Sequence, residues 1–171
     1  IGGVTWRIAG FDYWLNCGDT NTTAHHVVLV PDSVLHSAKM NNSNITTGGY
    51  VGSDFYTGAN SNTGKSDAIT KVNAAFGASH ILSHRELLTN AVTDGKASNS
   101  SWYDSTVDLM SEVMVYGTNA WTSNPPYEVG IDKSQLPLFR LDHSRICNRG
   151  TWWLRSVSSA SKFAGVTSNG A

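Results

Sequence analysis

Residues 59–66, ANSNTGKS, contain the residue types of a phosphate-binding loop. Such a loop reads G-x-x-x-x-G-K-[ST], follows a buried strand, and holds phosphates on backbone N–H groups and its lysine. The closing GKS matches, but Ala59 stands at the first position and the preceding GSDFYTG is not an apolar strand. We therefore interpret the segment as a polar loop in which Ser66 or Asp67 caps the helix that follows.

The histidines follow no metal-ligand spacing. His25 and His26 are adjacent, so on a strand they would point to opposite faces and could not share one metal ion. His80 and His84 are four residues apart, but they lie on either side of an expected helix start at Ser83. Neither a Cys-x-x-Cys pair nor an H-E-x-x-H motif is present. We predict no metal site and no cofactor.

The hydrolytic residue types follow no catalytic motif. The G-x-S-x-G sequence of a serine hydrolase is missing. A glycosidase needs two carboxylates placed on either side of the scissile bond. The glutamates are Glu86, Glu112 and Glu128, and the first two fall on expected helices. We predict that the protein is not an enzyme, with a cell-wall hydrolase as the third-ranked alternative.

Two tryptophans and an arginine lie close together near the C-terminal end, at Trp152, Trp153 and Arg155. On a strand, one tryptophan should face the core and the other the opposite side. Arg155 would share a face with Trp153 and can stack on its ring. We interpret the three as structural framework, and the alternative is an aromatic–arginine site for a sugar or a protein.

The composition is typical of one domain with strands, turns and long ordered loops. The chain has 171 residues, of which 40% are hydrophobic and 15% charged, with 16 glycines and six tryptophans. Cys17 and Cys147 are too few for a disulfide scaffold, and we interpret them as two free buried thiols, although a single pair is an alternative. No apolar run is long enough to cross a membrane.

Charge is unevenly distributed. Residues 133–171 contain six Lys or Arg residues and only one acid, Asp142, whereas the other twelve acids lie before them. We expect this basic end to bind the acidic remainder of the chain within the fold. The alternative is a basic face for an anionic partner such as a cell-wall polymer. Nucleic acid is not expected as a partner, because no dense run of Lys and Arg occurs.

Local patterns predict strands at both ends of the chain and helices between them. The expected strands are 4–15, broken near Gly10, then 26–30, 137–141, 152–157 and 162–166, with a turn at 158–161. Two helices are expected at residues 32–38 and around residues 69–76, the second ending at Gly77. Two more are expected to begin at the capping boxes Ser83-x-x-Glu86 and Ser105-x-x-Asp108, and the last of them should end at Gly117. Residues 41–64 are expected to form a long loop ordered by Tyr50, Phe55 and Tyr56.

The C-terminal run WWLRSVSSASKFAGVTSNG resembles the signature of a domain found widely in bacteriophage virion proteins and in some bacterial surface proteins. The signature is an aromatic pair, Leu-Arg, a variable stretch, Ala-x-Val and then Gly. Four upstream stretches also resemble the phage branch of this family: HHVVLVPDSVL, TTGGYVGSDFY, WYDSTVDLMSEVMVYG and QLPLFRL. The resemblance therefore extends over nearly the whole chain.

The resemblance implies an α+β fold of the C-type-lectin-like kind, with two or three helices, a small antiparallel sheet and long ordered loops. It implies a single domain over residues 1–171. In the family a further strand follows, usually carrying Gly-Val-Arg-Pro. We therefore expect this domain to lack its last strand and the natural chain to continue beyond residue 171.

The resemblance also implies a function at the virion surface. The first expectation is a non-enzymatic tail-fibre, head-fibre or decoration module that attaches to a host-cell surface glycan or protein. Such a module is expected to form a homo-oligomer and to contact other virion proteins. The second is a purely structural component that binds neighbouring virion subunits. The expected ligand-binding residues lie in loops or are exposed aromatics: Ser158, Ser161, Lys162, Asn169, Trp102 and Tyr127.

Overall fold

The computed structural model of the chain describes residues 1–60, 63–122 and 134–171. The helices in these residues are α1 (Asp54–Thr57), α2 (Lys65–Phe76), the 3-10 helix η1 (Ala78–His80), α3 (Glu112–Tyr116), α4 (Pro137–Leu141) and α5 (Ser144–Cys147). The strands are β1 (Trp6–Phe11), β2 (Val27–Pro31), β3 (His84–Thr93), β4 (Lys96–Ser105), β5 (Trp152–Ser159) and β6 (Lys162–Val166).

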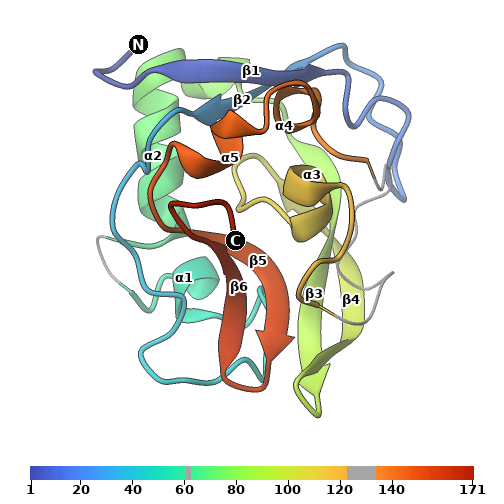
Figure 1. Cartoon of the computed structure of the whole chain (residues 1–171). Coiled ribbons are helices and arrows are strands. Elements are labelled where there is room, and N and C mark those ends of the chain that lie inside the picture. Colours follow the sequence, from blue (N-terminus) through green and yellow to red (C-terminus); the bar gives the residue numbers. More distant parts are fainter. Residues whose placement is uncertain (61–62, 123–133) are drawn as a thin grey trace.

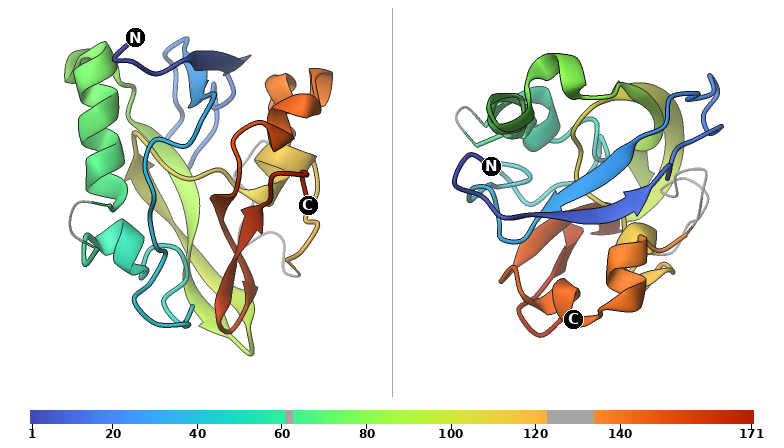
Figure 2. Two further views of the ribbon diagram at one scale, coloured as in Figure 1. Left: turned by 60° about the vertical axis from the view of Figure 1, so that its left-hand side comes forward. Right: turned by 90° about the horizontal axis from the view of Figure 1, so that it is seen from above.

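The six described strands form three separate antiparallel pairs, β1–β2, β3–β4 and β5–β6. The pair β1–β2 lies across one end of the molecule, with α2 on one side and α3, α4 and α5 on the other (Figure 1). The hairpins β3–β4 and β5–β6 run together toward the opposite end (Figure 2). This is an α+β architecture with small antiparallel sheets, as expected, although the helices are shorter and more numerous than two or three.

Strand β1 runs through Gly10 and ends at Phe11, so residues 12–15 are not part of the strand, and the irregularity expected near Gly10 is a register shift with β2 between Ile8 and Gly10. Helix α2 is confirmed. The N–H of Gly64 donates to the carboxylate of Asp67 at 2.9 Å, which caps the helix start, and Gly77 follows its end.

The helix expected after Ser83 is a strand instead. Residues 84–93 form β3, which alternates buried and less buried side chains and pairs with β4 along its length. Glu86 does not cap a helix, because its carboxylate is bound by Arg155 in the interior. The turn between the strands, Asp94-Gly95, has positive φ at both residues, the conformation of a tight two-residue hairpin turn.

The helix expected from Ser105 begins six residues later. Its cap is Ser111, whose side chain accepts the N–H of Met114, and it ends at Gly117 as expected. Asp108 does not cap a helix because Lys65 and Tyr50 bind its carboxylate.

Residues 137–141 were expected to form a strand and form helix α4. Pro137 occupies the first turn, where its missing N–H costs nothing, and Leu136 and Phe139 are buried three residues apart. The short helix expected at 32–38 is also wrong, since these described residues contain no helix. The side chain of Asp32 binds arginines instead of a helix end.

The C-terminal hairpin has the expected strands, β5 and β6. Trp152 is buried and Trp153 is 40% exposed, so the two rings point to opposite sides as predicted. Arg155 does not stack on Trp153, because it is drawn into the interior by Glu86.

Two buried clusters form the core. One lies under β1, β2, α4 and β5 and includes Leu136, Phe139, Leu154 and Val166. The other lies under the hairpins and includes Tyr50, Phe55 and Leu88. The burial of Tyr50 and Phe55 confirms that aromatic residues order the polar segment around them.

Candidate functional site

A cavity of about 1190 Å³ opens between α2 and the rest of the molecule. Its wall is formed by β2, residues 33–38, α2, residues 79–84, residues 105–110 and the start of β5. Typical small-molecule pockets measure about 300–1,000 Å³. The cavity is therefore large enough for a ligand of several rings.

Aromatic and imidazole rings are concentrated in this wall. Four of the six tryptophans line it: Trp6, Trp14, Trp152 and Trp153. Five of the six histidines do as well: His25, His26, His36, His80 and His84. The Trp14 ring lies 4.0 Å from that of His84 and 5.8 Å from that of His26, measured between centroids. Such surfaces suit ligands that present flat apolar faces.

A buried ion pair joins β3 to β5 at the cavity wall. Arg155 donates to Glu86 at 3.0 Å, and His84 lies 3.2 Å from the other carboxylate oxygen. Burial alone would raise the pKa of Glu86, but the Arg155 charge and the His84 contact outweigh it and hold that pKa below its ordinary value. The lowered pKa favours the ionised form of Glu86, which makes this residue unsuited to act as a general acid.

A second buried network surrounds Asp108. Lys65 approaches its carboxylate at 2.7 Å, and the Tyr50 hydroxyl donates to it at 2.8 Å. The Lys65 ammonium also lies 4.0 Å from the centre of the Tyr56 ring. Burial, followed by the Asp108 charge, raises the pKa of Tyr56 to about 12. The Lys65 ammonium is therefore already paired with the Asp108 carboxylate, which argues against a role of this lysine in phosphate binding.

Several buried N–H groups in the cavity wall have no partner among the described residues. They are Trp6 Nε1, Trp14 Nε1, Arg149 Nη2 and Arg155 Nη1. Buried polar groups in folded proteins are nearly always hydrogen-bonded. These four atoms have essentially no exposed surface, so they lie behind the cavity surface and are not presented to a ligand.

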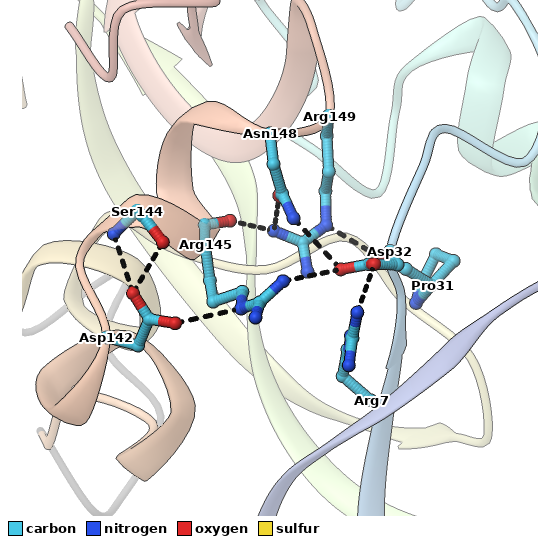
Figure 3. A network of polar contacts seen from close by, with 8 residues as sticks. All are labelled: Arg7, Pro31, Asp32, Asp142, Ser144, Arg145, Asn148 and Arg149. Carbon is cyan, nitrogen blue, oxygen red and sulfur yellow. Dashed lines mark hydrogen bonds and ion pairs between the residues drawn. The ribbon is translucent and has the colours of Figure 1, made fainter.

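Arginines gather around Asp32 in a polar cluster of which only Pro31 and Arg149 line the cavity (Figure 3). Arg7 binds one oxygen of Asp32 at 2.7 Å, while Asn148 binds the other at 3.0 Å. The Arg7 hydrogen bond, which outweighs partial burial, lowers the pKa of Asp32 to about 2. The contacts of Arg145 with Asp32 and of Arg155 with Glu86 confirm that the basic end of the chain binds the acidic remainder.

The residues expected to bind a ligand are not gathered in one place. Ser158, Ser161 and Lys162 lie at the turn of the β5–β6 hairpin, where Ser158 donates to the Lys162 carbonyl at 3.1 Å. Asn169 lies beyond the other end of β6. Trp102 is half-buried on β4. None of these residues lines the cavity, and Tyr127 lies outside the described residues.

The β1–β2 pair presents an apolar outer face. Ile8 is paired with Leu29 and Phe11 with Val27, and all four side chains are exposed, Phe11 to 66%. Contiguous exposed apolar surface of this kind often marks a contact with another molecule.

The described ranges contain no metal-binding cluster, no disulfide and no membrane-spanning helix. No group of three or more His, Cys, Asp or Glu side chains there is arranged to hold a metal ion. Neither Cys17 nor Cys147 is in a disulfide bond, and both are partly buried. Among the helices of those ranges, none has the length and apolar character needed to span a bilayer.

Sequence reasoning missed the cavity because its wall comes from segments spread over the whole chain. One available signal was Asp94-Gly95, a dipeptide typical of tight hairpin turns, which would have placed Glu86 on a strand. Arg149 gave no signal, because its environment depends on β2 and α4.

Comparisons with known proteins do not place the chain in a family. No protein-family model, curated protein sequence or solved structure matches it.

Proposed function

We propose that the chain is a C-type-lectin-like, non-enzymatic surface module of a bacteriophage virion that attaches to a glycan or protein on the host cell. The observation that carries the proposal is the cavity, whose wall is rich in tryptophan and histidine side chains. Sugars present apolar ring faces together with many hydroxyl acceptors, so this wall favours a glycan over a protein. The resemblance of the sequence to phage virion domains is the reason for proposing the virion surface as the location of the protein.

The charged groups in the wall support binding rather than hydrolysis. Glu86 is ion-paired with Arg155, and Asp108 with Lys65. A glycosidase acid must hold its proton at neutral pH, which requires a raised pKa. The lowered pKa of Glu86 is the opposite of that requirement.

The test is binding of the purified chain to an array of bacterial surface polysaccharides, followed by intrinsic fluorescence. Because four tryptophans line the cavity, a bound glycan should change the emission. Trp153→Ala should weaken binding about tenfold, since an aromatic stacking contact contributes roughly 0.5–1.5 kcal/mol beyond the area it buries. Trp121→Ala is the matched control, because Trp121 is exposed but does not line the cavity.

A second variant separates the cavity from the C-terminal hairpin. Changing Ser161 and Lys162 together to alanine should leave binding intact if the cavity is the site. Loss of binding in this variant, with Trp153→Ala unaffected, would move the site to the hairpin turn. A chain that binds no glycan and no host cell would contradict the attachment function altogether.

The apolar face of β1–β2 favours a second candidate, a structural module that assembles with a second copy of this chain. Ile8, Phe11, Val27 and Leu29 form the exposed face. Self-association through it would also give an attachment module several binding sites and thus avidity. Sedimentation of the purified chain over a range of concentrations tests it.

A further inference from the structure

We propose that His25 contacts the ligand at the mouth of the cavity, where its Nε2 atom accepts a hydrogen bond from a hydroxyl group of the bound glycan. The inference rests on the proposed attachment function and assigns a polar contact of that site. Asp12 is the positioning residue, because it fixes the tautomer and the orientation of the His25 ring.

The His25 ring lies in the cavity wall and is accessible from solvent, since its side chain is 83% exposed. Exposed and buried side chains alternate from this residue into β2. His25, Val27 and Leu29 are exposed. Between them, the side chain of His26 is only 7% exposed and Val28 is buried. A ligand in the mouth of the cavity can therefore reach His25, unlike the N–H groups that lie behind the wall surface.

The carboxylate of Asp12 decides which nitrogen of His25 carries the proton. His25 Nδ1 lies 2.8 Å from Asp12 Oδ2. This hydrogen bond is the largest cause of the lowered pKa of Asp12, so at neutral pH the carboxylate is ionised and can only accept. Nδ1 therefore holds the proton of the neutral ring, and Nε2 is left as an acceptor.

The Asp12 carboxylate is itself held in place. Its other oxygen, Oδ1, accepts the backbone N–H of His26 at 2.8 Å. Asp12 has a φ of 55°, in the left-handed region, which is uncommon for residues other than glycine. Such conformations cost energy and cluster at ligand-binding sites, where the surrounding structure holds them. His25 is thus oriented before a ligand arrives.

Other histidines of the wall lack this combination. His26 uses both ring nitrogens in hydrogen bonds with backbone groups, and His84 Nε2 lies 3.2 Å from Glu86. His80 is exposed, but its Nδ1 atom lies 2.9 Å from a neutral backbone carbonyl. A negatively charged partner at Nδ1 makes Nε2 a stronger base than a neutral partner does. These contrasts assign the contact to His25.

Apolar side chains lie on the same exposed side of this segment as His25. Val27 is 49% exposed and Leu29 is 37% exposed, and both line the cavity. A sugar ring has apolar C–H groups on its faces and hydroxyl groups around its edge. Binding sites typically combine an apolar surface with a few polar groups that fix the orientation of the ligand. One acceptor nitrogen beside two aliphatic side chains therefore fits a neutral sugar whose hydroxyl donates to Nε2.

The first experiment determines the tautomer of His25 by long-range proton–nitrogen NMR of the 171-residue chain. At about pH 8.5, where an ordinary imidazole is uncharged, the wild-type signals should show the proton on Nδ1. Asp12→Asn should move this proton to Nε2, because the new side-chain oxygen can still accept the His26 N–H while the NH2 group donates to Nδ1. Asparagine also tolerates the left-handed region, so the variant should fold. A tautomer that stays the same overturns the role of Asp12.

The second experiment measures binding of four neutral sugars: D-glucose, D-galactose, D-mannose and N-acetyl-D-glucosamine. At least one should shift the Nε2 signal of His25, and its fully O-methylated form, which has no hydroxyl to donate, should not. His25→Ala should weaken binding of that sugar about three- to tenfold, the range expected for one net hydrogen bond. His25→Gln retains an acceptor oxygen and should lose less. His143→Ala is the matched control, because His143 is an exposed histidine outside the cavity wall.

The outcomes separate this inference from the attachment function. A sugar that binds His25→Ala as tightly as wild type, or that shifts tryptophan signals but not those of His25, overturns the contact and leaves attachment standing. Loss of binding in His25→Ala but not in His143→Ala supports the contact. A chain that binds none of the four sugars and no surface polysaccharide contradicts both. Circular dichroism checks that His25→Ala is folded, and the O-methylated sugar tests the contact without any substitution.

Discussion

Arg155 Nη2 and Glu86 Oε2 lie 3.0 Å apart, and the two side chains are only 3% and 2% exposed. The contact joins residues 69 positions apart and holds β5 against β3 beside the cavity. A buried charge is costly unless its partner is present, so the two groups depend on each other.

Glu86→Gln should destabilise the fold by about 3–5 kcal/mol, because it leaves the buried Arg155 charge without its counter-ion. Urea unfolding followed by circular dichroism measures this. Asp104→Asn is the control, since Asp104 forms an exposed ion pair with Arg85, and such pairs contribute about 0–1 kcal/mol. Equal effects of the two substitutions would contradict the buried role of Glu86.

The free energy of unfolding should depend on pH through the carboxyl group of Asp32. Its pKa is about 2 in the folded chain, chiefly through the Arg7 hydrogen bond, against an ordinary value of 3.8. Because the folded pKa is depressed, the stabilisation is complete above about pH 4 and is lost as the pH falls toward 2. Asp32→Asn should therefore be less stable than wild type at pH 7.

The free-energy difference between Asp32→Asn and wild type should shrink as the pH is lowered from 5 to 2. Urea titrations at four or five pH values in this range test the prediction. A difference that stays constant with pH would show that Asp32 does not titrate in the arginine cluster.

Lys65→Met should destabilise the chain by about 1–3 kcal/mol, since it removes the ammonium that faces the buried carboxylate of Asp108. The Tyr50 hydroxyl still donates to that carboxylate and limits the loss. Lys71→Met, on the exposed face of the same helix, should cost less than about 0.5 kcal/mol. Thermal unfolding of both variants makes the comparison, and a Lys71 effect as large as that of Lys65 would refute it.

Phe11→Ser should reduce self-association if the apolar face of β1–β2 is a contact between copies. Analytical ultracentrifugation of the variant and of wild type measures the change in average mass. Val34→Ser serves as the control, because Val34 is exposed but lies outside these strands. A wild-type chain that stays monomeric at high concentration would rule out the contact.

The two ends of the fold were predictable because their patterns are local. Strands β5 and β6 are short runs of β-branched and aromatic residues separated by small polar ones, and the alternation placed Trp152 inside and Trp153 outside. Helix α2 was recognisable because Ser66 or Asp67 could cap its start and Gly77 stands at its end. Neighbours in the sequence decide such features.

The middle of the chain was not predictable in this way. Ser83-x-x-Glu86 and Ser105-x-x-Asp108 have the spacing of helix caps, but both carboxylates are bound by cations from other segments, Arg155 and Lys65. A buried ion pair outweighs a cap contribution of about 1 kcal/mol. Local spacing contains no information about which distant cation is present.

The sequence by itself determined the α+β class, the C-terminal hairpin, helix α2 and the binding of the basic end to the acidic remainder, because these follow from local periodicity and charge. Only the tertiary structure decided which arginines keep unpaired donors. Arg149 and Arg155 are six residues apart, yet Arg155 meets Glu86 from β3 and Arg149 meets only neutral carbonyls from β2 and α5. That difference is set by which distant segment packs against each guanidinium.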